Sequence, residues 1–229
     1  MTSPHVPLVF ERLSETEQLR RARSFFEHMS RRRSVRHFAP DPVPRALLED
    51  LLRTAGTAPS GAHRQPWRFV AVDDPRIKKE IRIAAEVEER EFYERRASRE
   101  WLADLEFLGL DWNKEFLETA PWIVAAFKVD FERAAGGRTH KNYYVSESVG
   151  LAVGLFLCAV HTAGLVALTH TPSPMKFLNR ILARTSNERP FVLMPFGFPA
   201  AEARVHTVPR KALEEIVQWN LGRGSPEVG

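Results

Sequence analysis

The sequence predicts a mixed β-sheet covered by helices. Three apolar runs of strand length, at residues 67–72, 122–129 and 190–198, are separated by longer segments with helical periodicity. The 229 residues are 44% hydrophobic and 27% charged, which provides enough apolar material for a sizeable core. This balance excludes a disordered chain, a collagen-like repeat and a low-complexity tail. No internal repeat or flexible linker divides the order of the elements.

Helices are predicted where apolar residues recur on one face and where helix-ending residues flank them. The first, at residues 14–30, sets Phe25 and Phe26 among charged neighbours. After the prolines of SVRHFAPDPVP, which favour an extended loop, a second helix starts near Pro44 and stops at Gly56. Further helices are predicted after the turn at residues 73–76, from near Tyr144 to about residue 163, around Lys176–Ala183, and at residues 211–219.

The remaining segments are predicted as a short strand, a loop and a charged helical face. LVALT, at residues 165–169, follows the long helix and has the composition of a buried strand. Residues 131–142, FERAAGGRTHKN, are predicted to form a surface loop. The almost entirely charged segment 86–100 is, by itself, typical of a solvated helical face.

Cysteine content, charge and apolar runs limit the class of protein. The single cysteine, Cys158, excludes an intramolecular disulfide framework and a cysteine-cluster zinc site, and we expect it in the core. Residues 149–168 lack charged side chains over a length that spans a bilayer, but their glycines favour a core helix followed by a strand. With no signal-peptide pattern, we expect a soluble, cytoplasmic protein. The net charge of +4 favours small anions over wrapping of nucleic acid.

Two segments are candidates for anion binding. RRRSVR, at residues 31–36, brings guanidinium groups and a hydroxyl before an extended loop, which suits a phosphate. Taken alone, this segment fits a nucleic-acid patch or solvated charge at least as well. In the loop APSGAHRQPW, at residues 58–67, Gly61 and Ala62 let the backbone approach an anion closely. The plain alternative is an ordinary loop.

Further candidates lie on the charged helix and at a strand end. Glu89 and Tyr93 stand four residues apart, so a helix places their carboxylate and phenol on one face, where they could hold an ammonium group. Lys114 could supply the matching charge for a carboxylate, although each of these residues is, taken singly, more often on the surface. The hydroxyls of Thr169 and Thr171 follow a predicted strand and either line a pocket or cap a turn.

Other polar residues give weaker signals. Arg210, before the last predicted helix, is either an anion ligand or a solvent-facing charge. The 8 histidines show no metal-ligand spacing, and the motifs H-E-x-x-H, G-x-G-x-x-G and G-x-S-x-G do not occur. We therefore expect histidines that are hydrogen-bonded or solvent-exposed, and neither a metal site nor a hydrolase triad.

Taken together, these motifs resemble the iodotyrosine deiodinase family of the nitroreductase-like FMN flavoproteins. The likeness runs from about residue 31 to residue 218, and the set Glu89, Tyr93 and Lys114 narrows it from the superfamily to the family. His170 departs from the commoner TTTP pattern, which affects packing against the flavin. The other matching segments are RRSVR (32–36), RTAGTAPSGAH (53–63), PWRFV (66–70), TAP (119–121), AGLV (163–166), THTP (169–172) and RK (210–211).

The resemblance implies an α+β, nitroreductase-like fold with a mixed, mostly antiparallel sheet flanked by helices, in an intertwined homodimer that binds each FMN at its interface. It implies an N-terminal extension with a dimer-contacting helix at residues 1–30, an FMN domain at 31–220 and a flexible tail at 221–229. The residues that the resemblance places on FMN are Arg32, Arg33, Ser34, Val35, Arg36, Ser60, Gly61, Thr169, His170, Thr171 and Arg210.

The resemblance also implies a substrate site. Glu89, Tyr93 and Lys114 would hold an amino-acid zwitterion, and the backbone of Ala62 would meet the phenolate oxygen. The hydroxyl of Thr171 would act as the catalytic group, because its donation to flavin N5 favours one-electron transfer. The charged segment 86–100 would be a lid that a ligand orders.

The implied activity is FMN-dependent reductive removal of iodide, bromide or chloride from halogenated tyrosine, in one-electron steps. NAD(P)H is the expected ultimate reductant, used directly or through a separate flavin reductase, and no metal, nucleic acid or membrane is expected to take part. A general NAD(P)H-dependent nitroreductase is the alternative if the three clamp residues lie on the surface. A basic nucleic-acid-binding module is a distant alternative.

Overall fold

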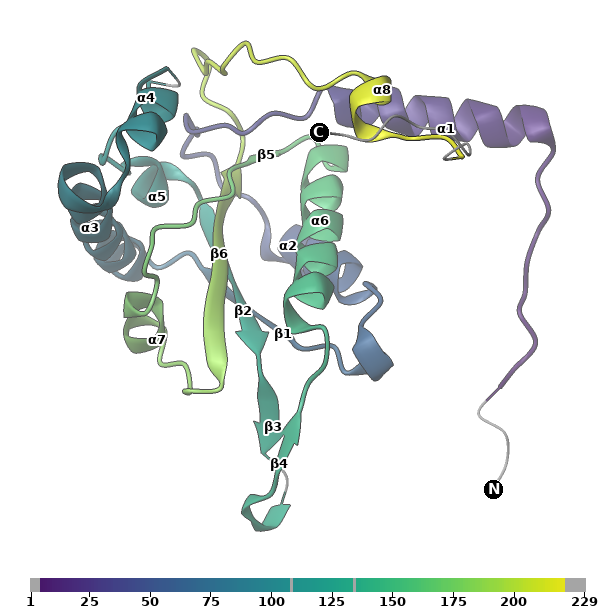
Figure 1. The fold of residues 1–229 in the computed structure, drawn as a ribbon, viewed down its shortest axis with the longest axis horizontal. Helices are drawn as coiled ribbons and strands as arrows, with labels where there is room; N and C mark the ends of the chain where they lie inside the picture. Colours follow the sequence, from purple (N-terminus) through teal and green to yellow (C-terminus); the bar gives the residue numbers. More distant parts are fainter. Residues whose placement is uncertain (1–4, 108, 134, 221–229) are drawn as a thin grey trace.

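A four-stranded sheet in the order β1-β2-β6-β5 lies at the centre of the computed structural model, which describes residues 5–107, 109–133 and 135–220 (Figure 1). All its strand pairings are antiparallel, and a parallel bridge between Ser34 and Ala167 extends it at β5. The prediction of a mixed, mostly antiparallel sheet is therefore confirmed. The strands are β1 (Trp67–Val72), β2 (Trp122–Val129), β5 (Val166–Ala167) and β6 (Glu188–Gly197).

Strand β2 forms the middle of the core because its sequence is apolar on both faces. Every residue of WIVAAFKV except Lys128 is buried, since helices cover both sides of the sheet. Val124 and Ala126 face a cluster with helices α2 (Arg45–Gly56) and α6 (Val145–Thr162). Ile123 and Ala125 face the opposite cluster. The alternation along one strand thus divides the interior into two cores.

The second core is covered by three helices that also approach the candidate site. These are α3 (Pro75–Glu91), α5 (Phe116–Thr119) and α7 (Phe177–Ile181). Asp74 caps α3 by accepting a hydrogen bond from the backbone N–H of Arg76, and Pro75 occupies its first turn. Figure 1 shows α3 and α7 on the side of the sheet opposite α6.

The segment 86–100 is helical but does not form one continuous helix. A π-helical turn, Phe92–Arg96, follows α3, and the chain is extended at Ala97 before α4 (Arg99–Phe107) begins. The prediction of a helical face is confirmed for the first part. The prediction that this face is solvated is wrong for Glu86 and Glu89, whose side chains are largely buried.

Two other predictions about elements need correction. The segment predicted as a surface loop contains a hairpin of β3 (Phe131–Arg133) and β4 (Thr139–Lys141), and Gly136 between them adopts a φ of 80°, which glycine accepts without strain. The last helix, α8 (Leu213–Ile216), is shorter than the predicted 211–219. The hairpin projects from the end of the sheet (Figure 1).

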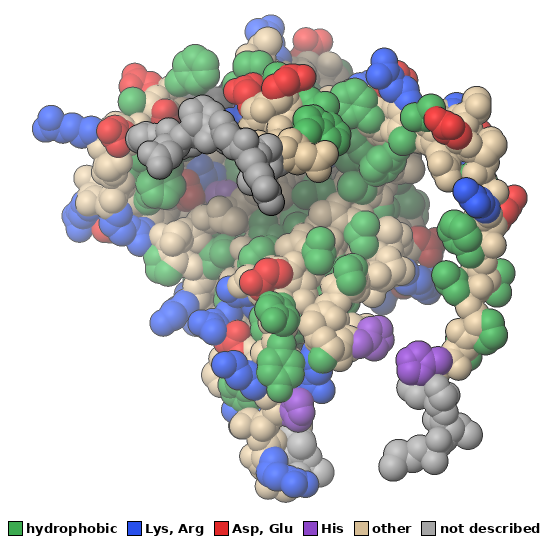
Figure 2. All heavy atoms as spheres, turned by 45° about the vertical axis from the view of Figure 1, so that its right-hand side comes forward, with side chains coloured by type: hydrophobic (Ala, Val, Ile, Leu, Met, Phe, Trp, Pro, Cys, Tyr) green, Lys and Arg blue, Asp and Glu red, His purple; other side chains and the backbone are tan. Residues whose placement is uncertain are grey.

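Helix α1 (Glu15–Ser30) packs near the end of α6 and leaves its apolar side chains uncovered by this chain. None of its residues is buried, and Phe26 is 63% exposed. Residues 6–10, which precede it, stand clear of the body and carry the exposed apolar side chains of Val6, Leu8, Val9 and Phe10 (Figure 2). The predicted boundaries at residues 30 and 31 stay predictions, and the predicted tail 221–229 lies outside the described residues.

Within the described ranges, α6 alone combines the length and composition of a membrane-crossing helix, with a mean hydropathy of 1.5. One third of its residues are buried inside the protein, including Val149 and Phe156 in the core between α2 and the sheet. A core helix passes the same test, so this property is weak support for a membrane span.

Candidate active site

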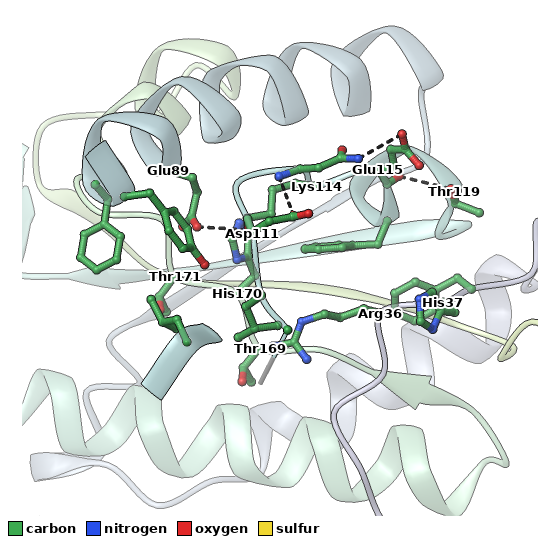
Figure 3. A pocket seen from close by; sticks show the side chains of 18 of the residues that line it. Arg36, His37, Glu89, Asp111, Lys114, Glu115, Thr119, Thr169, His170 and Thr171 are labelled. Carbon is green, nitrogen blue, oxygen red and sulfur yellow. Dashed lines mark hydrogen bonds and ion pairs between the residues drawn. The ribbon is translucent and has the colours of Figure 1, made fainter. Parts of the chain in front are cut away.

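A cavity of about 690 Å³ brings together seven of the predicted site residues (Figure 3). Its walls come from the end of α3, the π-helical turn, α4, the loop before α5 and the segment that follows β5. Phe92, Trp101, Leu105 and Phe116 form an apolar part of the wall. The predicted site residues in the lining are Arg36, Glu89, Tyr93, Lys114, Thr169, His170 and Thr171.

A buried ion pair forms one side of this cavity. Lys114 Nζ lies 3.1 Å from Glu89 Oε2, and the two side chains are only 8% and 15% exposed. The ammonium also donates to the carbonyl of Asp111 and lies 5.8 Å from the centre of the Tyr93 ring. Two opposite charges held apart from water can accept a zwitterion, whose carboxylate pairs with the lysine and whose ammonium pairs with the glutamate.

Tyr93 presents a neutral phenol to the same cavity. Burial raises the pKa of Tyr93 to about 12, and the carboxylates of Glu89 and Asp111 add to this effect. Glu89 lies near the end of α3 and Tyr93 lies four residues later in the π-helical turn, and both line the cavity. The phenol can therefore donate a hydrogen bond at any ordinary pH.

A second side of the cavity is formed by Thr169, His170 and Thr171, whose backbone is held by pairing with the sheet. His170 exchanges two backbone hydrogen bonds with Leu193 of β6, with N···O distances of 2.8 and 2.9 Å. This extended backbone turns successive side chains to opposite sides. Thr169 and Thr171 are exposed, whereas His170 is buried. All three side chains line the cavity, His170 as a buried residue and the two threonines as exposed ones, on a backbone that the sheet holds in place.

His170 contradicts the expectation that every histidine is hydrogen-bonded or exposed. Its Nε2 atom is buried and has no hydrogen-bond partner among the described residues. Burial lowers the pKa of His170 to about 3, and the positive charges of Lys114 and Arg36 contribute. The ring packs edge-on against Phe116, with the ring centres 5.5 Å apart. His170 is therefore neutral at physiological pH.

The arginines of RRRSVR pair with no carboxylate in the described part of the chain. Arg36 lines the cavity, and burial lowers the pKa of its guanidinium. Arg32 and Arg33 lie outside the lining and are half-buried. Most other buried or half-buried charges in this protein have a counterion, so these free guanidiniums indicate a site for an anion.

The residues around Arg32 are held by the sheet and by the C-terminal segment. Ser34 forms a bridge with Ala167, and the N–H of Val35 donates to the Ala167 carbonyl at 3.2 Å. Arg210 donates to the carbonyls of Ser30 and Arg32, each at 2.8 Å. These contacts place Arg210 beside the arginine segment but outside the cavity lining.

The predicted loop Ser60–Ala62 lies beside the first turn of α6, since the Gly61 N–H donates to Ser148 Oγ at 3.4 Å, and it lies outside the cavity lining. Ser60 Oγ accepts a hydrogen bond from the N–H of Gln65 at 2.9 Å. A Cβ at Gly61 would lie 2.9 Å from the ring of Tyr144, so only glycine fits there without a shift. Ala62 has a φ of 48°, a strained value for alanine that is often found at binding sites.

Comparisons with known proteins agree with the family resemblance of the sequence. A model of the nitroreductase family matches residues 29–198. The chain is 50% identical over 206 residues to an iodotyrosine deiodinase of Haliscomenobacter hydrossis, covering 90% of this chain and 93% of that protein. It is 40% identical over 216 residues to human iodotyrosine deiodinase 1, covering 93% of this chain and 74% of the human protein. The chain belongs to the iodotyrosine deiodinases, within the nitroreductase family.

Solved structures agree with this membership. A crystal structure of an oxidized iodotyrosine deiodinase, bound to FMN and 3-iodo-L-tyrosine, matches with a TM-score of 0.75 and 31% identity, covering 86% of this chain and 98% of that one. A BluB-like flavoprotein from Clostridium difficile, at 18% identity and a TM-score of 0.65, shares the fold alone. The predicted nitroreductase-like fold is confirmed.

The donor set of this chain fits FMN. A phosphate needs guanidinium or backbone N–H donors, and the arginines without counterions supply them. A flavin ring needs hydroxyl or backbone donors at its polar edge, and Thr169 and Thr171 are exposed for that role. Within the described residues, no group of three His, Cys, Asp or Glu side chains could hold a metal ion.

The motifs that identified the family did not reveal every residue in the cavity wall. Trp101, Leu105 and Phe116 were not predicted, and neither was Asp111, whose carbonyl accepts a hydrogen bond from Lys114. The available signal was the aromatic and leucine residues embedded in the charged stretch after residue 86. Phe92 and Trp101 pack edge-to-face with their ring centres 4.8 Å apart, which joins the π-helical turn to α4.

Proposed function

We propose that this protein is an FMN-dependent reductive dehalogenase that acts on halogenated tyrosine. The observation that carries the proposal is the buried Lys114–Glu89 ion pair, with Tyr93 beside it, in the same cavity as Arg36 and Thr171. The relative crystallised with FMN and 3-iodo-L-tyrosine supports the same pair of ligands. Its 31% identity extends over 86% of this chain.

The clamp binds the part of the substrate that does not react. The substrate carboxylate would pair with Lys114 and its ammonium with Glu89, while the Tyr93 phenol donates a hydrogen bond. Binding energy from this end fixes the halogenated ring in one position. The apolar side chains of Phe92 and Trp101 would exclude water from that ring.

The cofactor would be held by the guanidinium groups of Arg32, Arg33 and Arg36. Arg210 would keep the backbone of Arg32 in place. Bound FMN supplies electrons to the ring, and we propose that they pass one at a time. For each halide released, two electrons and one proton enter, the carbon–halogen bond breaks and a carbon–hydrogen bond forms. Thr171 is the group proposed to donate a hydrogen bond to flavin N5.

Two parts of the proposed activity lie outside a single chain: the second subunit and the source of electrons. We propose a homodimer, since Ser60–Ala62 lies outside the cavity of its own chain and α1 leaves apolar residues uncovered. We propose iodide, bromide and chloride as leaving groups, and NAD(P)H as the ultimate reductant, directly or through a flavin reductase. A cytoplasmic location stays a prediction.

The cavity favours this function over the alternatives. The alternative of a general nitroreductase requires Glu89, Tyr93 and Lys114 to lie on the surface. Lys114 and Glu89 are instead largely buried and lie beside one another. A nucleic-acid-binding module needs its basic residues accessible, whereas Arg36 is half-buried inside a cavity.

The test uses purified protein loaded with FMN and reduced with dithionite without oxygen. We expect stoichiometric release of iodide from 3-iodotyrosine and formation of tyrosine, with slower or no release from an iodophenol that lacks the amino-acid group. Unmodified tyrosine serves as the control. Absence of halide release, together with rapid oxidation of NAD(P)H by nitroaromatic acceptors, would establish the nitroreductase alternative.

A further inference from the structure

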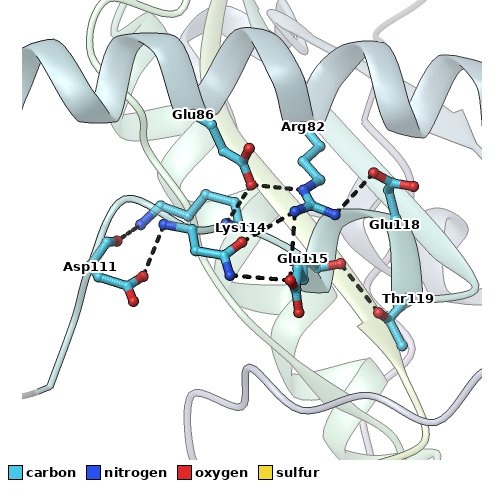
Figure 4. Close-up of polar contacts among 8 residues, drawn as sticks. Arg82, Glu86, Asp111, Lys114, Glu115, Glu118 and Thr119 are labelled. Atoms are coloured by element: carbon cyan, nitrogen blue, oxygen red, sulfur yellow. Dashed lines mark hydrogen bonds and ion pairs between the residues drawn. The ribbon is translucent and has the colours of Figure 1, made fainter.

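Helix α3 carries a row of charged side chains that face the loop holding Lys114 (Figure 4). Lys78, Arg82 and Glu86 are spaced one helical turn apart, so they lie on one face. Lys78 Nζ donates to the carbonyls of Glu118 and Ala120 at 2.9 and 2.8 Å. The end of α5, the helix that follows this loop, is therefore fastened to α3 by a buried lysine.

Arg82 connects this loop to α5. Its Nε atom donates to Glu86 at 2.7 Å, and its terminal nitrogens donate to Glu118 at 3.2 Å and to the Asn113 side chain at 3.3 Å. The side chains of Arg82 and Glu86 are only 25% and 15% exposed. A planar guanidinium with several partners, in a place with little water, has little freedom to move.

Glu86 joins this network to the substrate clamp. The oxygen that accepts from Arg82 also accepts the backbone N–H of Lys114, at 2.9 Å. One turn further along α3, Glu89 binds the ammonium of the same lysine at 3.1 Å. Helix α3 thus holds Lys114 at both ends, by its backbone through Glu86 and by its side chain through Glu89.

We infer that Glu86, oriented by Arg82, is a positioning residue that sets the Lys114 ammonium opposite Glu89 for recognition of the amino-acid end of the substrate. This inference rests on the proposed dehalogenase function. Glu86 does not line the cavity, so its effect passes through the backbone of Lys114. Contacts of this kind reduce the freedom that the clamp residue has to lose when a ligand binds.

Removal of Glu86 should weaken recognition of the substrate's amino-acid end selectively. Without Glu86, the Lys114 N–H loses its acceptor and Arg82 loses one of its fixed partners. The loop before α5 then samples other positions, and the ammonium leaves its place beside Glu89. Affinity for the amino-acid end falls, whereas contacts with FMN and with the halogenated ring stay the same, because their proposed residues lie on other elements.

The test compares Glu86→Ala with Glu80→Ala, an exposed position on the same helix. For FMN-loaded protein we measure Kd for 3-iodotyrosine and for 2-iodophenol by flavin fluorescence, and amide hydrogen exchange over residues 109–117. We expect Glu86→Ala to raise the 3-iodotyrosine Kd about tenfold and to speed exchange. The Kd values for 2-iodophenol and FMN should change less than about twofold. Glu80→Ala should behave as wild type.

Two more variants keep the test decisive. Glu86→Gln retains an acceptor for the Lys114 N–H and should recover most of the lost affinity. Arg82→Gln should raise the 3-iodotyrosine Kd several-fold, and it replaces Glu86→Ala as the test if that variant does not bind FMN. Unchanged 3-iodotyrosine binding, or equal losses for both ligands, overturns the positioning role. A wild-type protein that binds no 3-iodotyrosine overturns the proposed function instead.

Discussion

Lys114 and Glu89 show how strongly burial changes the meaning of a single side chain. On a surface, such a pair contributes little, because water screens both charges. In the cavity the pair is 8% and 15% exposed, so either residue without the other is a costly buried charge. Pairing the two charges avoids this cost, and a bound zwitterion can satisfy both of them.

Replacement of Lys114 by alanine should therefore weaken binding of the substrate's amino-acid end and leave FMN binding unchanged. We expect the Kd for 3-iodotyrosine to rise roughly 10- to 100-fold, because a charge-assisted hydrogen bond is lost and Glu89 stays buried without its cation. FMN binding should be unchanged, and fluorescence titration measures both. Lys79→Ala, at an exposed position of α3, is the matched control. Equal affinities for Lys114→Ala and wild type would contradict the clamp.

His170 gives a prediction about stability and pH. Its pKa is about 3 in the folded protein against an ordinary value of 6.5, so below pH 6.5 the unfolded chain binds more protons than the folded one. Stability should fall as the pH drops from 6.5 toward 3, with a loss of about 2 kcal/mol from this group by pH 5.

Urea unfolding of wild type and His170→Thr, at pH 7 and pH 5, measures this difference. The variant lacks the titrating ring, so its free energy of unfolding should change less between the two pH values. His140→Thr, in the exposed hairpin, should keep the pH dependence of wild type. The same pH dependence in His170→Thr and wild type would show that the ring is protonated equally in both states.

At the scale of elements, the sequence predicted strands better than connections. The run WIVAAFKV is apolar throughout because β2 is buried on both faces, and such a pattern has few alternatives. The hairpin of β3 and β4 was missed because its residues are polar and pair only with each other, outside the main sheet. The inward direction of Glu86 could not be predicted, because it depends on a loop 28 residues further along the chain.

The end of β6 provides a test of packing between elements. A Cβ at Gly197 would lie 2.5 Å from Cδ of Pro121, just before β2. We expect Gly197→Ala to lower the free energy of unfolding by about 1–3 kcal/mol, because neither the strand nor the proline ring can move aside cheaply. Gly56→Ala, where nothing lies within 4 Å, should be neutral or slightly stabilising. Thermal unfolding measures both, and an unchanged Tm for Gly197→Ala would show that the strand end adapts.

At the scale of the whole molecule, the predicted site residues occupy three places in one chain. Seven line the cavity, the arginine segment with Arg210 lies beside β5, and Ser60–Ala62 lies beside the first turn of α6. The motifs group these residues as candidates for one site, but a single chain does not bring them into one cavity. A second copy that contributes its own loop would explain the division, and sequence motifs contain no information about which chain supplies each residue.

The exposed face of α6 is the surface where that second copy should bind. Leu151 is 52% exposed there, in a shallow hollow with Gly150 and Gly154, whose lack of side chains allows close approach of another helix. We expect wild type to sediment as a dimer and Leu151→Glu as a monomer that loses FMN, because burying a carboxylate in an apolar interface is costly. Ile83→Glu, on the exposed side of α3, should remain a yellow dimer. A dimeric, FMN-bound Leu151→Glu would move the interface elsewhere, and a monomeric wild type that keeps FMN would show that one chain completes the site.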